Sequence, residues 1–202
     1  MIKRESRVLG IATLATIMMI GLAVTYLPLR SVRSGEPALG SDTQDAVKAI
    51  AGYRSWTKVN PTPELMDVRT STDCAAPIGG FGTYGPSNPH REKYITVYVN
   101  ELGRKAMMEQ RKPQFPEGSV IVKEKLSEPS STSPELLTVM IKREKGFNPE
   151  TGDWEYAVFD GTGTKLESRG KLSTCQGCHL SRPDTDYIFR TYLTDEVSNK
   201  LK

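Results

Sequence analysis

The sequence predicts an α+β fold: a mainly antiparallel β-sheet with flanking helices, preceded by one N-terminal transmembrane helix. Three observations predict it. A long uncharged apolar run lies near the N-terminus, four later runs are rich in β-branched and aromatic residues and bounded by turn residues, and short segments around them have helical periodicity. Strand runs with helices at their ends and side are typical of an α+β domain.

The N-terminal segment is predicted to be a membrane anchor. Residues 8–29 carry no charge, and a helix of this length reaches roughly 33 Å, enough to cross a hydrocarbon core. A cleaved signal peptide, the alternative, usually has a shorter apolar run and a small-x-small site, which residues 25–30 lack. We expect residues 1–33 to form a cytoplasmic tip and anchor (or signal peptide), residues 34–44 a linker, and residues 45–202 the exported domain.

The basic character of the chain belongs to its N-terminal end. Of 27 basic and 24 acidic residues, five basic and one acidic lie up to residue 33, which leaves 22 basic and 23 acidic. A near-neutral domain without Lys/Arg blocks lacks the positive field that captures nucleic acid. We therefore expect no nucleic-acid partner.

The first element of the exported part is a helix. Ser41 or Asp42 can cap its first N–H groups, and Ala46, Ile50 and Tyr53 follow at helical spacing.

Strands follow a Pro-, Gly-, Asn- and Thr-rich stretch, residues 57–92, which is expected to be mostly loop. A helix is expected at residues 101–111, with Ala106 and Met107 facing inward. The strands are expected at residues 94–99, 119–126, 136–142 and 154–159.

A cysteine motif near the C-terminus carries the chemistry. Cys175 and Cys178 lie three residues apart, on one side of a helical turn, and His179 follows at once. This spacing is typical of c-type haem attachment, in which two thiols bond to the haem vinyl groups and the histidine binds iron. Because haem c is attached outside the bacterial cytoplasmic membrane, the motif favours a periplasmic domain on a membrane anchor.

Three other interpretations of the cysteines remain open. A thioredoxin-like pair normally lies in a parallel sheet with a long helix after it, whereas little chain follows His179. In a second alternative, Cys175 and Cys178 form a disulfide with each other. A structural zinc would draw its four ligands from Cys74, Cys175, Cys178 and either His90 or His179.

Several separated stretches resemble the cytochrome P-460 family. They are YRSWTKVNP (53–61), FPEGSVIVKEKL (115–126), GDWEYAVF (152–159), CQGCH (175–179) and DTDYIFRTYL (184–193). The resemblance covers roughly residues 45–195. It implies a mono-haem c-type cytochrome with a mostly antiparallel sheet, often dimeric, related to the cytochrome c′-beta proteins that bind nitric oxide.

The resemblance gives Lys123 a role. In members of the family that oxidise hydroxylamine, a lysine in the Gly-x-Val-x-Val-Lys-Glu strand is bonded to the porphyrin, and Lys123 holds the matching position. By strand alternation Lys123 shares a face with Ile121, while Val120 and Val122 face the other side. The ordinary alternative is a strand lysine that faces solvent.

The sequence departs from the hydroxylamine-oxidising members after the haem motif, where they have a proton-handling carboxylate. Residues 180–183 contain none, and Asp184 and Asp186 are more typical of helix caps or salt bridges. We expect Cys74 to be a buried thiol, with an intermolecular disulfide as the alternative. Trp56, Trp154 and Tyr156 are expected in the core or the haem wall.

The sixth iron ligand decides between ligand binding and electron transfer. We expect an open or weakly occupied distal site. The candidate ligand types in the domain are Met66, Met107, Met108, Met140 and His90.

Together these features predict a membrane-anchored periplasmic cytochrome with one haem c. Its expected chemistry is the redox conversion of hydroxylamine or nitric oxide, with non-catalytic nitric oxide binding and plain electron transfer as alternatives. The expected partners are a small nitrogenous ligand, a redox partner cytochrome, the membrane and a second copy of the chain.

Overall fold

The computed structural model describes residues 39–66 and 92–202. The predicted anchor, together with Cys74 and His90, lies outside the described residues. Within the described residues, no helix is long and apolar enough to cross a membrane.

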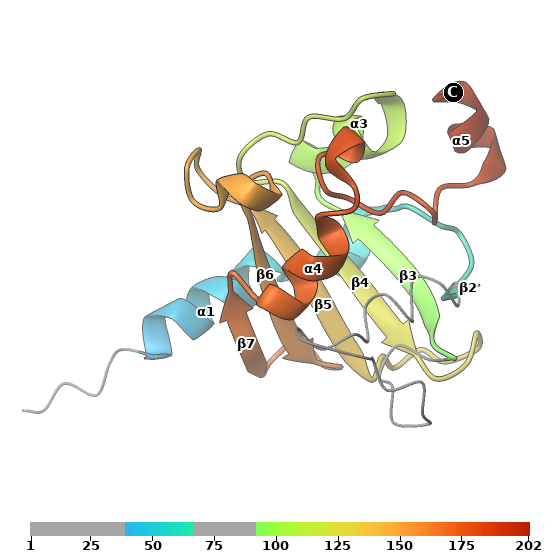
Figure 1. Cartoon of the computed structure of the whole chain (residues 1–202). Coiled ribbons are helices and arrows are strands. Elements are labelled where there is room, and N and C mark those ends of the chain that lie inside the picture. The colour runs from blue at the N-terminus through green and yellow to red at the C-terminus, as the bar shows by residue number, and fades with distance from the viewer. Residues whose placement is uncertain (1–38, 67–91) are drawn as a thin grey trace, which may run out of the picture. The chain divides into compact units, whose positions relative to one another are not determined.

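An antiparallel sheet forms the body of the unit that spans residues 37–202 (Figure 1). Its strands run in the order β1-β3-β4-β5-β6-β7, and β2 also pairs with β3. Every pairing is antiparallel, so the predicted α+β architecture is confirmed. The strands are β1 (Thr57–Lys58), β2 (Glu64–Leu65), β3 (Tyr94–Val99), β4 (Val120–Leu126), β5 (Leu136–Lys142), β6 (Trp154–Asp160) and β7 (Leu166–Gly170).

Three of these strands were not predicted. β1 and β2 are two residues long, too short to show alternation, and they form because they pair with β3. Between them, the buried Asn60 side chain accepts from the Val97 N–H at 2.9 Å and donates to the Ile95 carbonyl at 2.8 Å. β7 is a polar edge strand that ends at Gly170, and its sequence resembles a turn.

Four helices and three short 3-10 turns surround the sheet in the described residues. The helix predicted after residue 41 begins earlier, at Leu39, and ends at Ala49, because Gly52 (φ 70°) turns the chain before Tyr53. Ala106 and Met107 are buried as predicted. The elements are α1 (Leu39–Ala49), α3 (Glu101–Glu109), α4 (Ser173–His179), α5 (Asp195–Lys200), η1 (Tyr53–Ser55), η2 (Pro149–Thr151) and η3 (Pro183–Thr185).

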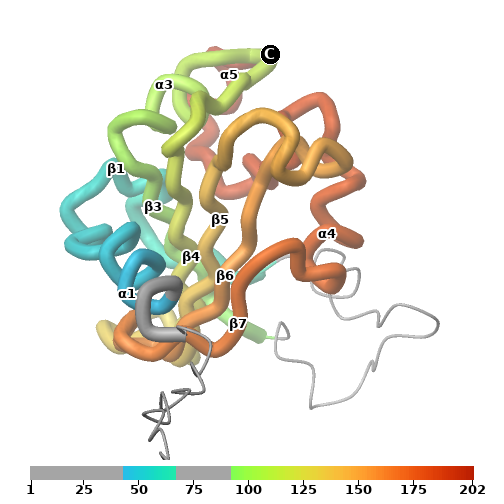
Figure 2. The backbone as a smooth tube through the Cα atoms, turned by 90° about the vertical axis from the view of Figure 1, so that its left-hand side faces the viewer, coloured from blue at the N-terminus to red at the C-terminus, as the bar shows by residue number. Residues whose placement is uncertain are grey.

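The sheet has a hydrophobic cluster on each face. Figure 2 shows α1 and α4 on opposite sides of the strands. Val120 and Val122 of β4 belong to the cluster that includes Ala46 of α1 and Ile50 just after it, whereas Ile121 belongs to the cluster that packs against Cys175. The alternation predicted for β4 therefore holds, and the face that carries Ile121 is the one that α4 covers.

Candidate functional site

A cavity lies between α4 and the sheet. It encloses about 890 Å³ of empty space, including its solvent-open mouth. Most of its lining side chains are apolar or aromatic, as in small-molecule and cofactor sites. The lining comes from β3 to β6, from α4 and from residues 188–192, and it includes all four residues that the sequence singled out: Lys123, Cys175, Cys178 and His179.

The short helix α4 brings the thiols and the imidazole to one wall of the cavity. Cys175 and Cys178 share a face because three residues span almost one helical turn. The connection between β5 and β6 holds this helix in place. Its buried Asn148 accepts from Gln176 Nε2 at 3.1 Å and donates to the Thr151 hydroxyl at 2.7 Å and the Trp154 carbonyl at 2.9 Å.

One nitrogen of His179 is occupied by the backbone. Nδ1 lies 2.6 Å from the carbonyl oxygen of Tyr187. A carbonyl oxygen only accepts, so Nδ1 carries the proton in this hydrogen bond. The tautomer leaves the Nε2 lone pair as the nitrogen that can bind a metal.

Burial also keeps the His179 ring neutral. His179 is half-buried and lines the cavity, and burial lowers its pKa to about 4 although the Tyr187 carbonyl opposes this change. The positive charge of Lys123 lowers the pKa further. A neutral imidazole is the form that binds a metal ion.

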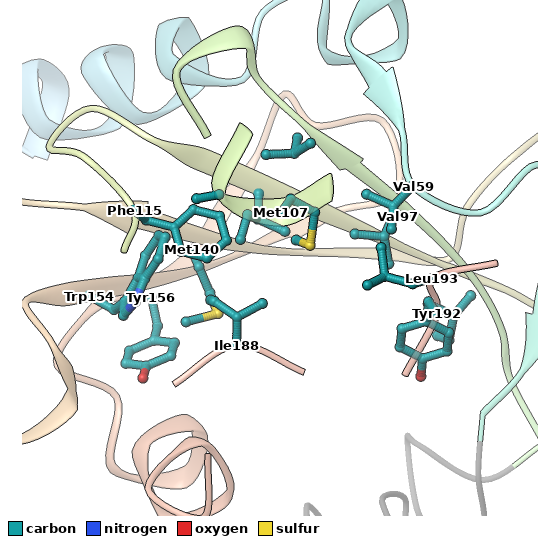
Figure 3. Packing of buried hydrophobic residues seen from close by; sticks show 14 of the residues in the cluster. Val59, Val97, Met107, Phe115, Met140, Trp154, Tyr156, Ile188, Tyr192 and Leu193 are labelled. Atoms are coloured by element: carbon teal, nitrogen blue, oxygen red, sulfur yellow. The ribbon is translucent and has the colours of Figure 1, made fainter. Parts of the chain in front are cut away.

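Aromatic rings flank His179 on two sides. The ring centroids of Tyr156 and Phe189 lie 5.4 Å and 5.1 Å from that of His179. Figure 3 shows Tyr156 and Tyr192 projecting from the packed cluster in the same direction, with Ile188 between them. These contacts restrict the rotation of the imidazole.

The Tyr156 hydroxyl is a buried polar group without a hydrogen-bond partner among the described residues. Burial raises its pKa to about 12, and the nearby Thr151 hydroxyl, which lies outside hydrogen-bond geometry, offsets part of that rise. A buried hydroxyl without a hydrogen-bond partner costs folding free energy unless a bound group supplies the missing hydrogen bond.

Lys123 lines the cavity. It lies on β4 with Ile121 on the same face, directly across from Thr138 of β5, and all three side chains line the cavity. The lysine is half-buried. The structure therefore brings the lysine of the family motif to the same cavity as the cysteines and the histidine.

The other predicted candidates divide between the cavity and the core. Met140 lines the cavity, whereas Met66 and Met107 are buried in the hydrophobic cluster without reaching it. Trp154 is a core residue. Asp186 forms the salt bridge that its sequence context suggested, with Lys142 at 2.7 Å.

Sequence reasoning named residues 184–193 only as part of the family resemblance and did not predict that this segment completes the cavity. Ile188, Phe189 and Tyr192 line it after the chain turns back from α4, and nothing in their local pattern indicates this role. Arg190 holds the segment by donating to the carbonyls of Gln110 at 2.7 Å and Met107 at 2.8 Å, at the end of α3.

These residues fit an iron porphyrin. Two thiols and a neutral imidazole with an available Nε2 lie on one wall of a largely apolar cavity, and Tyr156, whose hydroxyl is buried without a partner among the described residues, lines the same cavity. Within the described residues, no three His, Cys, Asp or Glu side chains gather as a metal site. The zinc alternative depends on Cys74, with either His90 or His179 as the fourth ligand, and both Cys74 and His90 lie outside the described residues.

A family model, described as Cytochrome P460, matches residues 50–190. The match includes all seven described strands of the sheet, α3, α4 and residues 188–190 of the segment that completes the cavity. No curated protein matches the chain.

Proposed function

The chain belongs to the cytochrome P460 family, and from this premise we propose that it is a membrane-anchored periplasmic cytochrome with one covalently bound haem c. The family implies the haem cofactor. The observation that carries the proposal is the wall formed by α4, where Cys175, Cys178 and His179 face one cavity and the Tyr187 carbonyl fixes the imidazole tautomer.

In this proposal each side chain has a separate task. Cys175 and Cys178 hold the haem through thioether bonds, so that the cofactor stays in a cavity with an open mouth. His179 presents Nε2 to the iron, and Tyr156 and Phe189 prevent its ring from turning. When bound, the haem would supply a redox centre.

The proposed reaction is redox chemistry of hydroxylamine or nitric oxide, with a redox partner cytochrome taking or supplying electrons. Lys123 and Thr138 supply an amine and a hydroxyl in an otherwise largely apolar lining, which suits a small polar ligand. The family resemblance assigns Lys123 a bond to the porphyrin.

Two observations favour the alternatives. Asp186 is committed to Lys142 and therefore cannot serve as a proton-handling carboxylate, which favours nitric oxide binding without catalysis. Met140 lines the cavity, and a thioether on iron would favour plain electron transfer.

The visible spectrum of the purified full chain, oxidised and dithionite-reduced, together with its alkaline pyridine derivative, tests these proposals. A strongly red-shifted ferrous Soret band would support the Lys123 bond and the hydroxylamine chemistry. An ordinary c-type spectrum would keep haem attachment and move the function to an alternative. A chain without haem, made with a working maturation system, would overturn the proposal.

Ferric spin state then separates the alternatives. Iron that is purely low-spin and does not bind nitric oxide would exclude both ligand binding and catalysis.

Membrane anchoring has its own test, because the full chain should pellet with membranes whereas a variant without residues 1–33, exported by a cleavable signal, should not.

A further inference from the structure

We propose that the buried ion pair of Lys142 and Asp186 positions the imidazole of His179 through the Tyr187 carbonyl, and thereby sets the reduction potential of the iron. This inference rests on the proposed haem function. It makes Lys142 and Asp186 positioning residues, since neither lines the cavity.

The ion pair is short and largely removed from solvent. Lys142 Nζ lies 2.7 Å and 2.8 Å from the two carboxylate oxygens of Asp186, and the exposed fractions of the two side chains are 13% and 7%. The ammonium also lies 5.0 Å from the centroid of the Trp154 ring. Removing one partner of such a pair leaves the other charged and buried, so the two are strongly coupled.

The backbone around Asp186 is held from two further sides. Its carboxylate accepts the Phe115 N–H at 2.9 Å, and its carbonyl oxygen accepts from Trp154 Nε1 at 2.8 Å. Lys142 ends β5, Trp154 begins β6, and Phe115 belongs to the connection between α3 and β4. Asp186 is therefore bonded to the sheet by both its side chain, through Lys142, and its main chain, through Trp154.

These contacts hold a backbone conformation that non-glycine residues rarely adopt. Asp186 (φ 52°) and Tyr187 (φ 63°) are consecutive left-handed residues. Such conformations persist where surrounding contacts over-determine them. Gly152 shows how closely the turn packs, because a Cβ atom there would lie 2.7 Å from both Asp186 Oδ1 and Tyr187 Cδ2.

The turn aims the Tyr187 carbonyl at the ring. With two left-handed residues in succession, the chain after α4 reverses, and the Tyr187 oxygen comes to lie 2.6 Å from His179 Nδ1. Asp186 thus connects the ion pair to the hydrogen-bond acceptor through a single peptide unit.

A hydrogen bond to the remote nitrogen of a metal-bound histidine fixes its orientation and raises its basicity. A more basic ligand stabilises ferric over ferrous iron and lowers the reduction potential. Loss of the ion pair should therefore loosen the turn, weaken this bond and raise the potential.

The test uses the haem-loaded full chain with Asp186→Asn and Lys142→Gln. We expect both variants to shift the ratio of oxidised to reduced protein at fixed potential by about tenfold, equivalent to about 59 mV for one electron. The iron–histidine stretch of the ferrous protein, measured by resonance Raman spectroscopy, should fall to lower frequency. Lys142→Arg keeps the charge and should restore both values.

Asp184→Asn and Lys145→Gln are matched controls, since both side chains are exposed and close to the pair in sequence. They should leave the potential and the stretch unchanged. If Asp186→Asn fails to fold, Lys142→Gln decides alone, because it leaves the bonds of Asp186 to Phe115 and Trp154 in place.

Wild-type potential and stretch frequency in a folded, haem-loaded Lys142→Gln variant would overturn the inference while leaving haem binding intact. A wild-type chain without haem would overturn the proposed function itself, and with it the inference. The haem content of the wild-type protein distinguishes the two failures.

Discussion

Lys123 and Thr138 are direct partners across the β4–β5 pairing, and both side chains line the cavity that contains the two thiols and His179. The lysine charge reaches the imidazole, because it contributes to the lowered pKa of His179, after the larger effect of burial. The motif lysine and the cysteine motif are 52 residues or more apart in sequence, yet they form one site.

Replacing Lys123 tests whether its position has a chemical consequence. In Lys123→Ala we expect haem to remain attached, since neither thiol is affected, while any red shift of the ferrous Soret band and any hydroxylamine oxidation are lost. The measurements are the visible spectrum and the oxidation assay. Lys145→Ala, an exposed lysine, is the control and should behave as wild type. Retained oxidation in Lys123→Ala would refute the role of this lysine.

Replacing the thiols tests covalent attachment. Cys175→Ser with Cys178→Ser should leave no haem on the polypeptide after denaturing electrophoresis, because both thioether bonds are removed. Either single variant should keep one bond and retain haem in reduced yield. Cys74→Ser is the matched control and should retain haem at the wild-type level. Haem that stays with the denatured double variant would show that another residue attaches it.

Tyr53 should make the domain sensitive to alkaline pH. Burial and then its hydrogen bond to Glu124, at 2.6 Å, raise the pKa of the Tyr53 hydroxyl well above its ordinary value. The folded state therefore holds this proton more tightly than the unfolded state, so its contribution is fully present below about pH 10 and is lost as pH rises further. Urea unfolding at increasing pH should show a shallower loss of stability in Tyr53→Phe than in wild type.

At neutral pH the same Tyr53→Phe variant should lose about 1 kcal/mol, the typical net contribution of one hydrogen bond. Arg54 still pairs with Glu124 at 2.8 Å, so the carboxylate is not left alone. Equal slopes for wild type and variant above about pH 10 would contradict the assignment to Tyr53.

Gly152 should tolerate no side chain. Gly152→Ala adds a Cβ atom at 2.7 Å from Asp186 and Tyr187 and places alanine at φ 65°, so we expect a loss of about 2–4 kcal/mol in the free energy of unfolding. Gly146→Ala is the matched control, because Gly146 also has positive φ (94°) but no atom within 4 Å of the added carbon.

The control should lose only about 1 kcal/mol, the cost of backbone strain alone. Denaturant titration measures both values. Similar losses in Gly146→Ala and Gly152→Ala would show that the close approach of the added carbon to Asp186 and Tyr187 does not destabilise the protein.

Local pattern predicted the central strands well. The expected strands 94–99 and 136–142 match β3 and β5 at both ends, because alternating β-branched and aromatic residues between turn residues indicate a strand without help from distant contacts. β1, β2 and β7 escaped prediction because partner strands, not their own composition, stabilise them.

The sequence by itself predicted the proposed cofactor chemistry, since Cys175, Cys178 and His179 lie within five consecutive residues whose spacing is a local property. It also indicated which face of β4 carries Lys123, through strand alternation. Only the tertiary structure decided that both belong to one cavity, that residues 188–192 complete it, and that the Tyr187 carbonyl holds His179. The physical reason is that every residue has a backbone carbonyl, so the sequence does not distinguish the Tyr187 carbonyl as the acceptor. The pairing of Lys142 with Asp186 joins side chains 44 positions apart, which no local pattern reveals.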